Sequence, residues 1–145
     1  MGIMKRRRGT AIVETPRGIL VTSGRSKLFL LPGGGANKGE TRTVAAIREL
    51  KEETGLTANY VKLLFRYVGS VHKSHSGGFF QDHHTVCLIK ANGTARPKHE
   101  IKHLAYYHPD SDIKLSKTTK EIIVKFLEYK KEHPNYEEWM KWDTT

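Results

Sequence analysis

The sequence has very little cysteine and no long apolar run, and each absence excludes a class of protein. The one cysteine, Cys87, cannot form an internal disulfide, and its place in the apolar stretch TVCLIK indicates a buried small hydrophobic residue rather than a nucleophile. No apolar run approaches the roughly 20 residues of a membrane span. The basic start, MGIMKRRRG, lacks the continuous apolar segment of a signal peptide. We therefore expect a cytoplasmic protein with no membrane partner.

Internal repeats and linker-like segments are absent as well, and the 145 residues have the size of one domain. Hydrophobic residues make up 37% and charged residues 28%, as in an ordinary globular protein. Lys and Arg number 25 against 15 Asp and Glu, a net charge of +10. Such a surface should attract phosphorylated ligands, although a solvated surface is the simpler interpretation for any one residue of the KRRR stretch.

Apolar periodicity predicts a mixture of strands and helices. We expect strands in GTAIVET, ILVTS, KLFLLP, YVKLLFRYVGSV, HHTVCLIKA and HLAYYH. A helix is predicted from Thr41 to Thr54, with Thr41 as the N-cap and Gly55 just past its end. Because short turns join neighbouring strands, the pattern favours an α/β class, with a mixed sheet covered by helices.

A second helix is predicted from Thr118 to Glu132, and Thr118 and Glu121 are expected to form its capping box. We assign residues 1–133 to a single domain and residues 134–145 to a C-terminal tail. The two tryptophans of this tail favour docking onto the domain.

The first helix is predicted to have an apolar and an acidic side. The apolar side carries Val44, Ile47 and Leu50, and the acidic side carries Glu49, Glu52 and Glu53. The carboxylates repel one another near a helix C-terminus, where the macrodipole disfavours anions. We expect Ala45 and Ala46 to leave room beside them, and the preceding LPGGG to let backbone approach closely. Such a cluster suits a hard divalent cation, Mg²⁺ above all, which in turn recruits phosphate oxygens.

The spacing of this region carries a resemblance. It reads Gly34, five residues, Glu40, seven residues, Arg48-Glu49-Leu50, Lys51, Glu52-Glu53, Thr54 and Gly55-Leu56. This resembles, without a departure, the Nudix box of the MutT-like hydrolases, G-x5-E-x7-R-E-U-x-E-E-x-G-U, in which U is aliphatic. Nine positions in 23 residues are specified, so the signal is strong.

The resemblance implies a Nudix-type α/β/α sandwich with a central mixed β-sheet. It also implies hydrolysis of a nucleoside diphosphate linked to another moiety, with Mg²⁺ or Mn²⁺. Carried over by position, Glu52 and Glu53 would be metal ligands, and Glu49 a ligand or the base that activates water. Arg48 would orient a glutamate, and Glu40 would support the site from behind.

The glycines and a later acidic residue receive roles from the same resemblance. Gly33 or Gly34 would offer a backbone carbonyl to the metal, while the bare backbone at Gly34 and Gly35 would admit the pyrophosphate. Glu100 is the best candidate for a further metal ligand or base, and Asp82 is the second choice.

The stretch HKSHSGGFFQDHH offers candidate substrate contacts outside the box. His72 and its neighbours would contact phosphates while Phe79 or Phe80 stacks on a base. A zinc site is disfavoured because no cysteine lies nearby and the ligand spacing is not tight. A polar hairpin with packed phenylalanines is the alternative.

The substrate we expect first is a nucleoside triphosphate, an oxidised one included. The alternatives are a dinucleoside polyphosphate, a diphosphoinositol polyphosphate, an RNA 5′ end, or a nucleotide that a non-catalytic Nudix module senses. ADP-ribose is disfavoured, because residues 69–72 hold no counterpart of the proline typical of ADP-ribose pyrophosphatases. All four box glutamates are present, which favours catalysis. Nucleic acid is not a required partner, and the chain is expected to be a monomer or homodimer.

Overall fold

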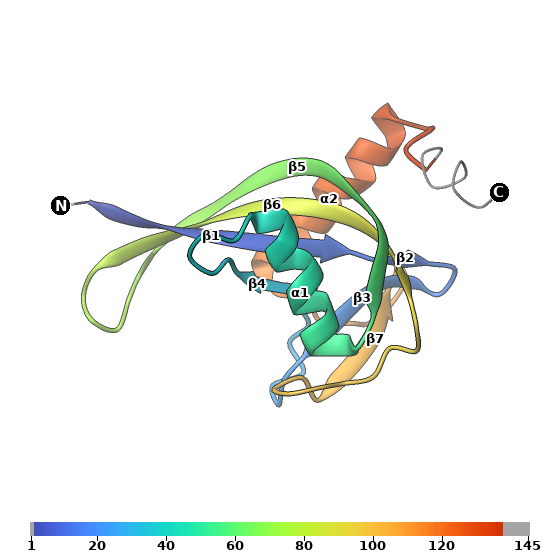
Figure 1. The fold of residues 1–145 in the computed structure, drawn as a ribbon, viewed down its shortest axis with the longest axis horizontal. Coiled ribbons are helices and arrows are strands. Elements are labelled where there is room, and N and C mark those ends of the chain that lie inside the picture. The colour runs from blue at the N-terminus through green and yellow to red at the C-terminus, as the bar shows by residue number, and fades with distance from the viewer. Residues whose placement is uncertain (1, 138–145) are drawn as a thin grey trace.

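The computed structural model describes residues 2–137, which form seven strands and two helices (Figure 1). In chain order these are β1 (Ile3–Ile12), β2 (Glu14–Thr15), β3 (Gly18–Ser23), β4 (Gly33–Gly35), α1 (Arg42–Thr54), β5 (Thr57–Lys73), β6 (Phe79–Asn92), β7 (His103–Tyr107) and α2 (Lys117–Glu132).

The strands form two sheets. The larger has the order β4-β1-β6-β5, in which β1 and β6 run parallel and the other pairs are antiparallel. The smaller is antiparallel, with the order β2-β3-β7. The mixed sheet predicted from the short turns is therefore confirmed.

The core consists of two layers, because strands β1 and β6 are buried on both faces. Ala11 of β1 and Val13, the residue just after this strand, join the cluster beneath α1, whereas Ile12 between them joins the cluster beneath α2. On β6, Cys87 lies on the α1 side and Val86 on the α2 side. Alternate side chains of a strand point to opposite faces, so a strand buried on both sides requires a helix on each. This arrangement confirms the α/β/α sandwich, and Cys87 is buried as expected.

Helix α1 has the ends predicted for it. The Thr41 hydroxyl accepts a hydrogen bond from the Val44 amide, and Gly55 adopts a left-handed φ of 80° just past the last turn. The prediction of its faces was partly wrong. Val44 is 49% exposed, whereas Ala45 and Ala46 are fully buried. Ala46 therefore lets the helix pack closely on β1, and neither alanine borders open space beside the carboxylates.

Two further predictions were wrong. The stretch KLFLLP makes only isolated bridges at Phe29 and Leu30, and the strand that follows consists of the glycines themselves. Helix α2 is capped by Ser116, whose hydroxyl accepts from the Thr119 amide, so Thr118 is inside the helix. The Ser116 amide is fixed by a hydrogen bond to the Phe29 carbonyl, and this tertiary contact sets where the helix begins.

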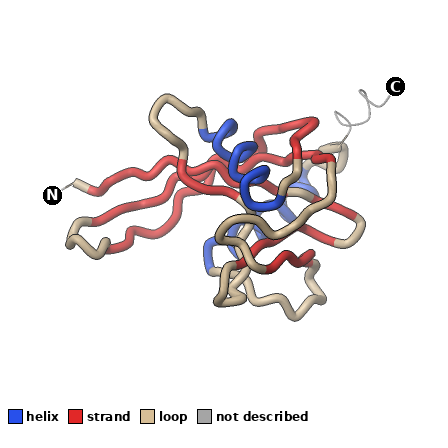
Figure 2. The backbone as a smooth tube through the Cα atoms, turned by 60° about the horizontal axis from the view of Figure 1, so that its bottom comes forward, coloured by secondary structure: helices blue, strands red, loops and turns tan. Residues whose placement is uncertain are grey.

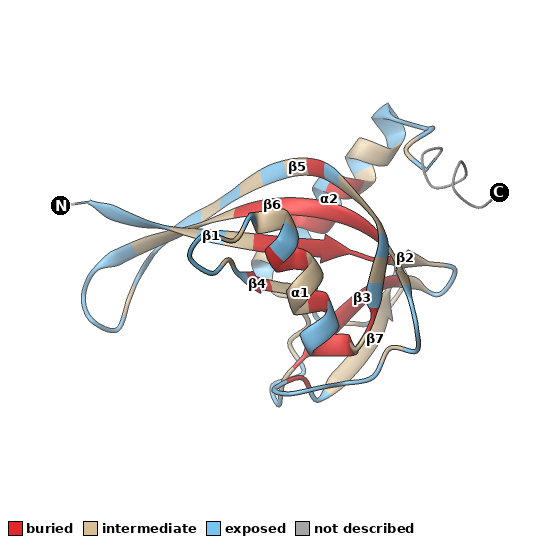
Figure 3. Ribbon diagram, viewed as in Figure 1, coloured by how far each residue is buried: buried red, intermediate tan, exposed pale blue. Residues whose placement is uncertain are grey.

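The predicted His-rich loop is mostly strand. Strand β5 continues to Lys73 and β6 begins at Phe79, so only residues 74–78 form the turn of a long hairpin. The outer part of this hairpin and the first half of β1 extend together beyond both helices (Figures 1 and 2). Most of this three-stranded arm is exposed on its surface (Figure 3).

The beginning of the predicted tail packs on the domain. The Tyr136 ring meets the edge of Phe126 with ring centroids 6.1 Å apart, and its hydroxyl donates to Glu14. Residues 138–145, which include both tryptophans, lie outside the described residues. Within residues 2–137, neither helix is long and apolar enough to cross a membrane.

Candidate active site

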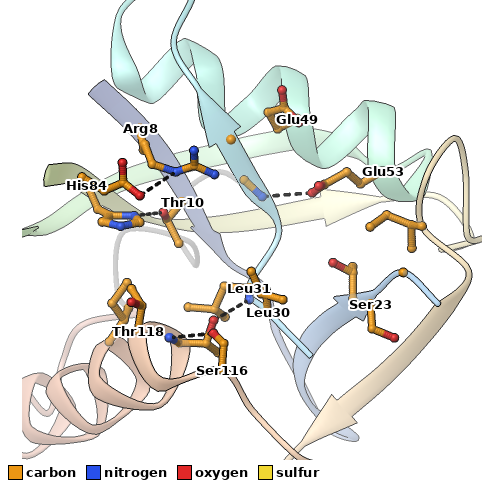
Figure 4. A pocket seen from close by; sticks show the side chains of 18 of the residues that line it. Arg8, Thr10, Ser23, Leu30, Leu31, Glu49, Glu53, His84, Ser116 and Thr118 are labelled. Atoms are coloured by element: carbon orange, nitrogen blue, oxygen red, sulfur yellow. Dashed lines mark hydrogen bonds and ion pairs between the residues drawn. The ribbon is translucent and has the colours of Figure 1, made fainter. Parts of the chain in front are cut away.

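A cavity of about 550 Å³ lies beside α1 and strand β4 (Figure 4). Glu49 and Glu53 project into it from α1, and Gly33 and Gly34 of β4 form part of its wall. Glu100 also lines it, from the loop before β7. The fold thus brings together three predicted acidic residues from segments about 50 positions apart.

Arg48 connects the carboxylates around this cavity. Its Nε and Nη2 donate to the two Glu40 carboxylate oxygens at 2.8 and 2.9 Å, and Nη2 also donates to the Gly35 carbonyl at 2.9 Å. Nη1 donates to Glu49 at 2.8 Å and to Glu52 at 3.2 Å. The guanidinium fork thus holds three carboxylates in one arrangement. Its hydrogen bonds, with one from the Asn37 amide, lower the pKa of Glu40 to about 2.

Glu53 is the buried member of the acidic cluster. Its residue is 8% exposed, and its Oε1 accepts a hydrogen bond from the Gly33 amide at 3.0 Å. Burial above all raises the pKa of Glu53 to about 8; the nearby carboxylates of Glu49 and Glu100 act in the same direction, and the Gly33 hydrogen bond acts against it. A carboxyl group in such a place is stabilised as an anion only when a cation is supplied.

Glu52 lies apart from this group. Its side chain is 50% exposed, and it is not among the residues that line the cavity. It reaches the site through the shared Arg48 contact.

One of the three consecutive glycines is required by close backbone packing, and a second faces a glutamate side chain at short distance. A Cβ atom on Gly33 would lie 2.3 Å from the Gly9 carbonyl oxygen of β1, so a side chain would force β4 away from its partner strand. A Cβ atom on Gly34 would lie 2.6 Å from the Glu49 carboxyl carbon. Gly35 has open space around it and lines a separate shallow groove beside β1.

The donor set fits a hard divalent cation. The candidate ligands Glu49, Glu53 and Glu100 offer carboxylate oxygens only, in the chemistry that Mg²⁺ and Mn²⁺ prefer. Within residues 2–137, the buried Glu53 has no cationic hydrogen-bond partner. In the arrangement of residues 2–137, no three His, Cys, Asp or Glu side chains lie close enough together to bind one ion. Ligation would therefore require the carboxylates to move toward the metal.

The cavity has a second region, in which Thr10 and His84 meet, and the sequence did not indicate this pair. His84 is 8% exposed, and its Nδ1 shares a 2.8 Å hydrogen bond with the Thr10 hydroxyl. Burial, and then the charge of Arg8, lower the pKa of His84 to about 4. Asp82, the second-choice acidic residue, also lines the cavity, where it binds Arg6 at 2.6 Å.

The far wall of the cavity is formed by the start of α2 and the end of β3. It carries the hydroxyl residues Ser116, Thr118 and Ser23 (Figure 4). The buried Ser23 hydroxyl has no hydrogen-bond partner among the described residues.

The aromatic candidates lie elsewhere. His72, Phe79 and Phe80 belong to the arm and do not line the cavity. Phe80 stacks on His72 with centroids 5.4 Å apart and receives the Arg6 guanidinium on its ring at 4.0 Å. The structure therefore does not bring these three residues together with the glutamates.

Comparisons with known proteins agree with this geometry. A sequence profile of the NUDIX domain matches residues 4–142. A nudix hydrolase family member from Chromobacterium violaceum has a similar structure, with a TM-score of 0.73 and 37% identity over 90% of this chain and 81% of that one.

Two more distant structures share the fold. The ORF135 protein of E. coli has a TM-score of 0.67 at 23% identity, over 91% of this chain and 95% of that one. The NUDIX domain of Shewanella oneidensis NrtR, determined in complex with ADP ribose, has a TM-score of 0.64 at 13% identity, over 88% of each chain. A search of curated proteins found no match. The profile match over nearly the whole chain and the 37% identical structure show that the chain belongs to the Nudix family.

Proposed function

We propose that the protein is a pyrophosphohydrolase that cleaves a phosphoanhydride bond of a nucleoside triphosphate, an oxidised one included, with the help of a divalent metal ion. The observation that carries this proposal is the buried Glu53, which shares the cavity with Glu49 and Glu100. Among the described residues, the Gly33 amide is its only hydrogen-bond donor. Nudix proteins are in general pyrophosphohydrolases that use divalent ions, and the complete box favours turnover over sensing.

The roles of the residues follow from their positions. Glu53 and Glu49 would hold the metal, with Glu100 as a further ligand or the base. Arg48 would keep Glu49 and Glu52 in place through its fixed fork. A bound Mg²⁺ would neutralise phosphate charge and lower the pKa of its water, as divalent ions do in phosphoryl chemistry. The bare backbone at Gly34 would let the phosphates approach the carboxylates.

The other half of the cavity suits the nucleoside. Its volume of about 550 Å³ falls within the range of small-molecule sites. The Ser23, Ser116 and Thr118 hydroxyls offer hydrogen bonds to a sugar or base, and Arg8 beside His84 offers a cation to a phosphate. The distant relative NrtR binds ADP ribose in the same fold, which supports a nucleotide as the ligand class.

The first test is product release from a panel of substrates. Nucleoside triphosphates with normal and oxidised bases, dinucleoside polyphosphates, ADP-ribose, a diphosphoinositol phosphate and 5′-triphosphate RNA would each be incubated with Mg²⁺, with Mn²⁺ and with chelator. We expect metal-dependent release of pyrophosphate from a nucleoside triphosphate. Turnover of another class alone would refute the substrate, and tight nucleotide binding without turnover would indicate a sensor.

A substitution tests the site itself. Glu53→Gln keeps the shape and the acceptor for the Gly33 amide but removes the metal-binding charge, so turnover should fall by about 100-fold or more. Glu128→Gln, at an exposed glutamate of α2, is the matched control and should retain full activity. Full metal-dependent activity of Glu53→Gln would refute the assignment.

A further inference from the structure

The arm carries cations on the side that faces away from the catalytic cavity. Along β1, Arg6 and Arg8 line the cavity, and the alternation of a strand turns Lys5 and Arg7 to the opposite face. Lys5 and Arg7 are both exposed. Two neighbours add to them, Arg66 on β5 and Arg42 at the start of α1. We call Lys5, Arg7, Arg42 and Arg66 the basic face.

The strand register arranges this face in rows. Arg7 pairs with His83, which pairs with Val68, and Lys5 pairs with Gln81, which pairs with Val71. At the outer end, Ile3, Phe79 and Lys73 form another row. Successive rows lie two residues apart, about 6.6 Å along a strand. This repeat is similar to the distance between phosphates in an extended single strand of nucleic acid.

The cations of the basic face differ from those on the cavity side in their partners. Arg6 and Arg8 both lie beside the Asp82 carboxylate. Within residues 2–137, no carboxylate forms an ion pair with Lys5, Arg42 or Arg66. Arg7 donates to the Glu40 backbone carbonyl at 2.6 Å, and its charge also acts on the Glu40 carboxylate, which Arg48 binds. The positive charge of this face is therefore largely uncompensated.

These cations are close enough to repel one another. Burial lowers the pKa of Arg42, and the charges of Arg66 and Arg7 lower it further. Partial desolvation lowers the pKa of His83, and Lys5 and Arg42 act in the same direction. Stability alone does not explain such a gathering of like charges.

The beginning of α1 adds to the positive potential. The helix starts at Arg42 and has no acidic residue in its first turn, so no anionic side chain of that turn offsets the positive end of its macrodipole. A Cβ atom on Gly9 would lie 2.0 Å from the Arg42 carbonyl oxygen, which shows how closely this end of the helix is pressed onto β1. The basic face and the helix terminus therefore form one continuous surface.

We propose that the basic face binds the phosphate backbone of single-stranded RNA. A polymer of phosphates is the anion that matches cations repeated along a strand, and the net charge of +10 would bring it to the protein. Exposed apolar side chains lie in the same rows, with Phe79 at 38%, Val71 at 45% and Val68 at 49% exposure. Cations interleaved with a ring and apolar contacts are typical of single-strand binding, in which bases stack on the protein.

This inference does not depend on the hydrolysis proposed above. The basic face surrounds the N-terminal end of α1, whereas Glu49, Glu52 and Glu53 lie toward its C-terminal end, and its four basic residues include no metal-ligand candidate. An inactive protein could bind RNA there, and an active hydrolase of free nucleotides could lack such binding.

The test is the binding of a fluorescently labelled single-stranded RNA of about 12 uridines, followed by anisotropy at several salt concentrations. The double variant Lys5→Glu/Arg66→Glu should weaken binding by at least 10-fold. If two phosphate contacts are lost, the slope of log affinity against log salt should become shallower by about 1.4. Turnover of a small nucleotide should stay within about twofold of the original.

The matched control is Lys114→Glu/Lys131→Glu, which changes two exposed lysines elsewhere and alters the net charge equally. It should weaken binding by less than about threefold. Thermal melting would check that each variant is folded. If the charge-reversal variant Lys5→Glu/Arg66→Glu does not fold, the neutral variant Lys5→Gln/Arg66→Gln replaces it. Equal losses in both double variants, or no RNA binding at low salt, would overturn the proposal.

A final measurement distinguishes RNA from any other chain of phosphates. Phe79→Ala should weaken RNA binding by about fivefold or more, as the loss of one stacked base does, and should leave binding of inorganic polyphosphate unchanged. If polyphosphate of the same charge competes as well as RNA and Phe79→Ala has no effect, the surface recognises phosphate chains alone and the assignment to RNA is wrong.

Discussion

The two ends of helix α1 carry charges of opposite sign, and each sign is the one that the helix macrodipole disfavours. Arg42 begins the helix beside Arg7 and Arg66, where the dipole favours anions. Glu52 and Glu53 occupy the last turn, where the dipole favours cations. A helix selected for stability alone would have the reverse arrangement.

The difference between the ends lies in how the charge is held. At the C-terminal end, Arg48 binds Glu40, Glu49 and Glu52, and Glu53 is buried. At the N-terminal end, no described residue holds the cations in a comparable network of ion pairs. Fixed geometry is needed to position a metal and a reacting water, whereas a polymer can be bound by side chains that adapt to it. The way in which charge is held therefore distinguishes the proposed catalytic site at the C-terminal end of α1 from the proposed binding surface at its N-terminal end.

The substitution Arg48→Lys should break the network that Arg48 forms with Glu40, Glu49 and Glu52. Lysine keeps the charge but cannot form the fork to Glu40 while it also reaches Glu49, Glu52 and the Gly35 carbonyl. We expect kcat/KM for the metal-dependent reaction to fall by about 10- to 100-fold. Arg42→Lys makes the same change at the other end of the helix and should leave kcat/KM unchanged. Equal activity of both variants would show that the Arg48 network does not position the carboxylates.

Burial of Glu53 should make the metal-free protein less stable as pH rises. The pKa of Glu53 is raised from 4.5 to about 8, so the folded protein keeps a proton that the unfolded chain releases. Stability that is present below about pH 4.5 is therefore lost progressively up to about pH 8. In chelator, we expect the unfolding free energy of the original protein, relative to Glu53→Gln, to decrease by about 1–3 kcal/mol between pH 5 and pH 8. Parallel pH profiles in urea unfolding would contradict this.

Sequence patterns predicted the parts of the site that lie on one element. The helix limits at Thr41 and Gly55 followed from local capping chemistry, and the box identified Glu49, Glu52 and Glu53 from spacing within one helix. Spacing could not distinguish the buried Glu53 from the exposed Glu52, because they are neighbours on the helix and only the position of β4 decides which is covered.

Contacts between distant segments could not be predicted in the same way. The pair Thr10 and His84 depends on the parallel register of β1 and β6, 74 positions apart. The strand at the glycines was missed because glycine has little strand propensity, yet the close approach of Gly33 to Gly9 requires it there. At the start of α2, both Ser116 and Thr118 were chemically able to cap, and the contact of Ser116 with Phe29 decided between them.

A smaller change tests how closely the glycine strand approaches the acidic end. In Gly34→Ala, the new methyl group would lie 2.6 Å from the Glu49 carboxyl carbon, so that side chain must turn away. Because the displaced atoms end a side chain, we expect little loss of stability but about a 10-fold lower kcat/KM. Gly69→Ala is the control, since its Cβ would meet only the Asp82 carbonyl oxygen at 3.7 Å. Unchanged activity of Gly34→Ala would mean that the position of Glu49 is not critical.

The smallest effect is expected at the basic end, where Arg42→Glu should stabilise the protein. The change places an anion at the helix N-terminus and removes the repulsion from Arg7 and Arg66, which together should add about 0.3–1 kcal/mol to the unfolding free energy. Arg42→Gln removes the repulsion without adding the anion, so it should give part of the gain. The same Arg42→Glu protein should bind single-stranded RNA more weakly, because it loses a cation of the basic face. A gain in melting temperature together with a loss of RNA affinity would show that the cation is kept there for binding at a cost in stability, whereas a loss of both would mean that Arg42 supports the fold.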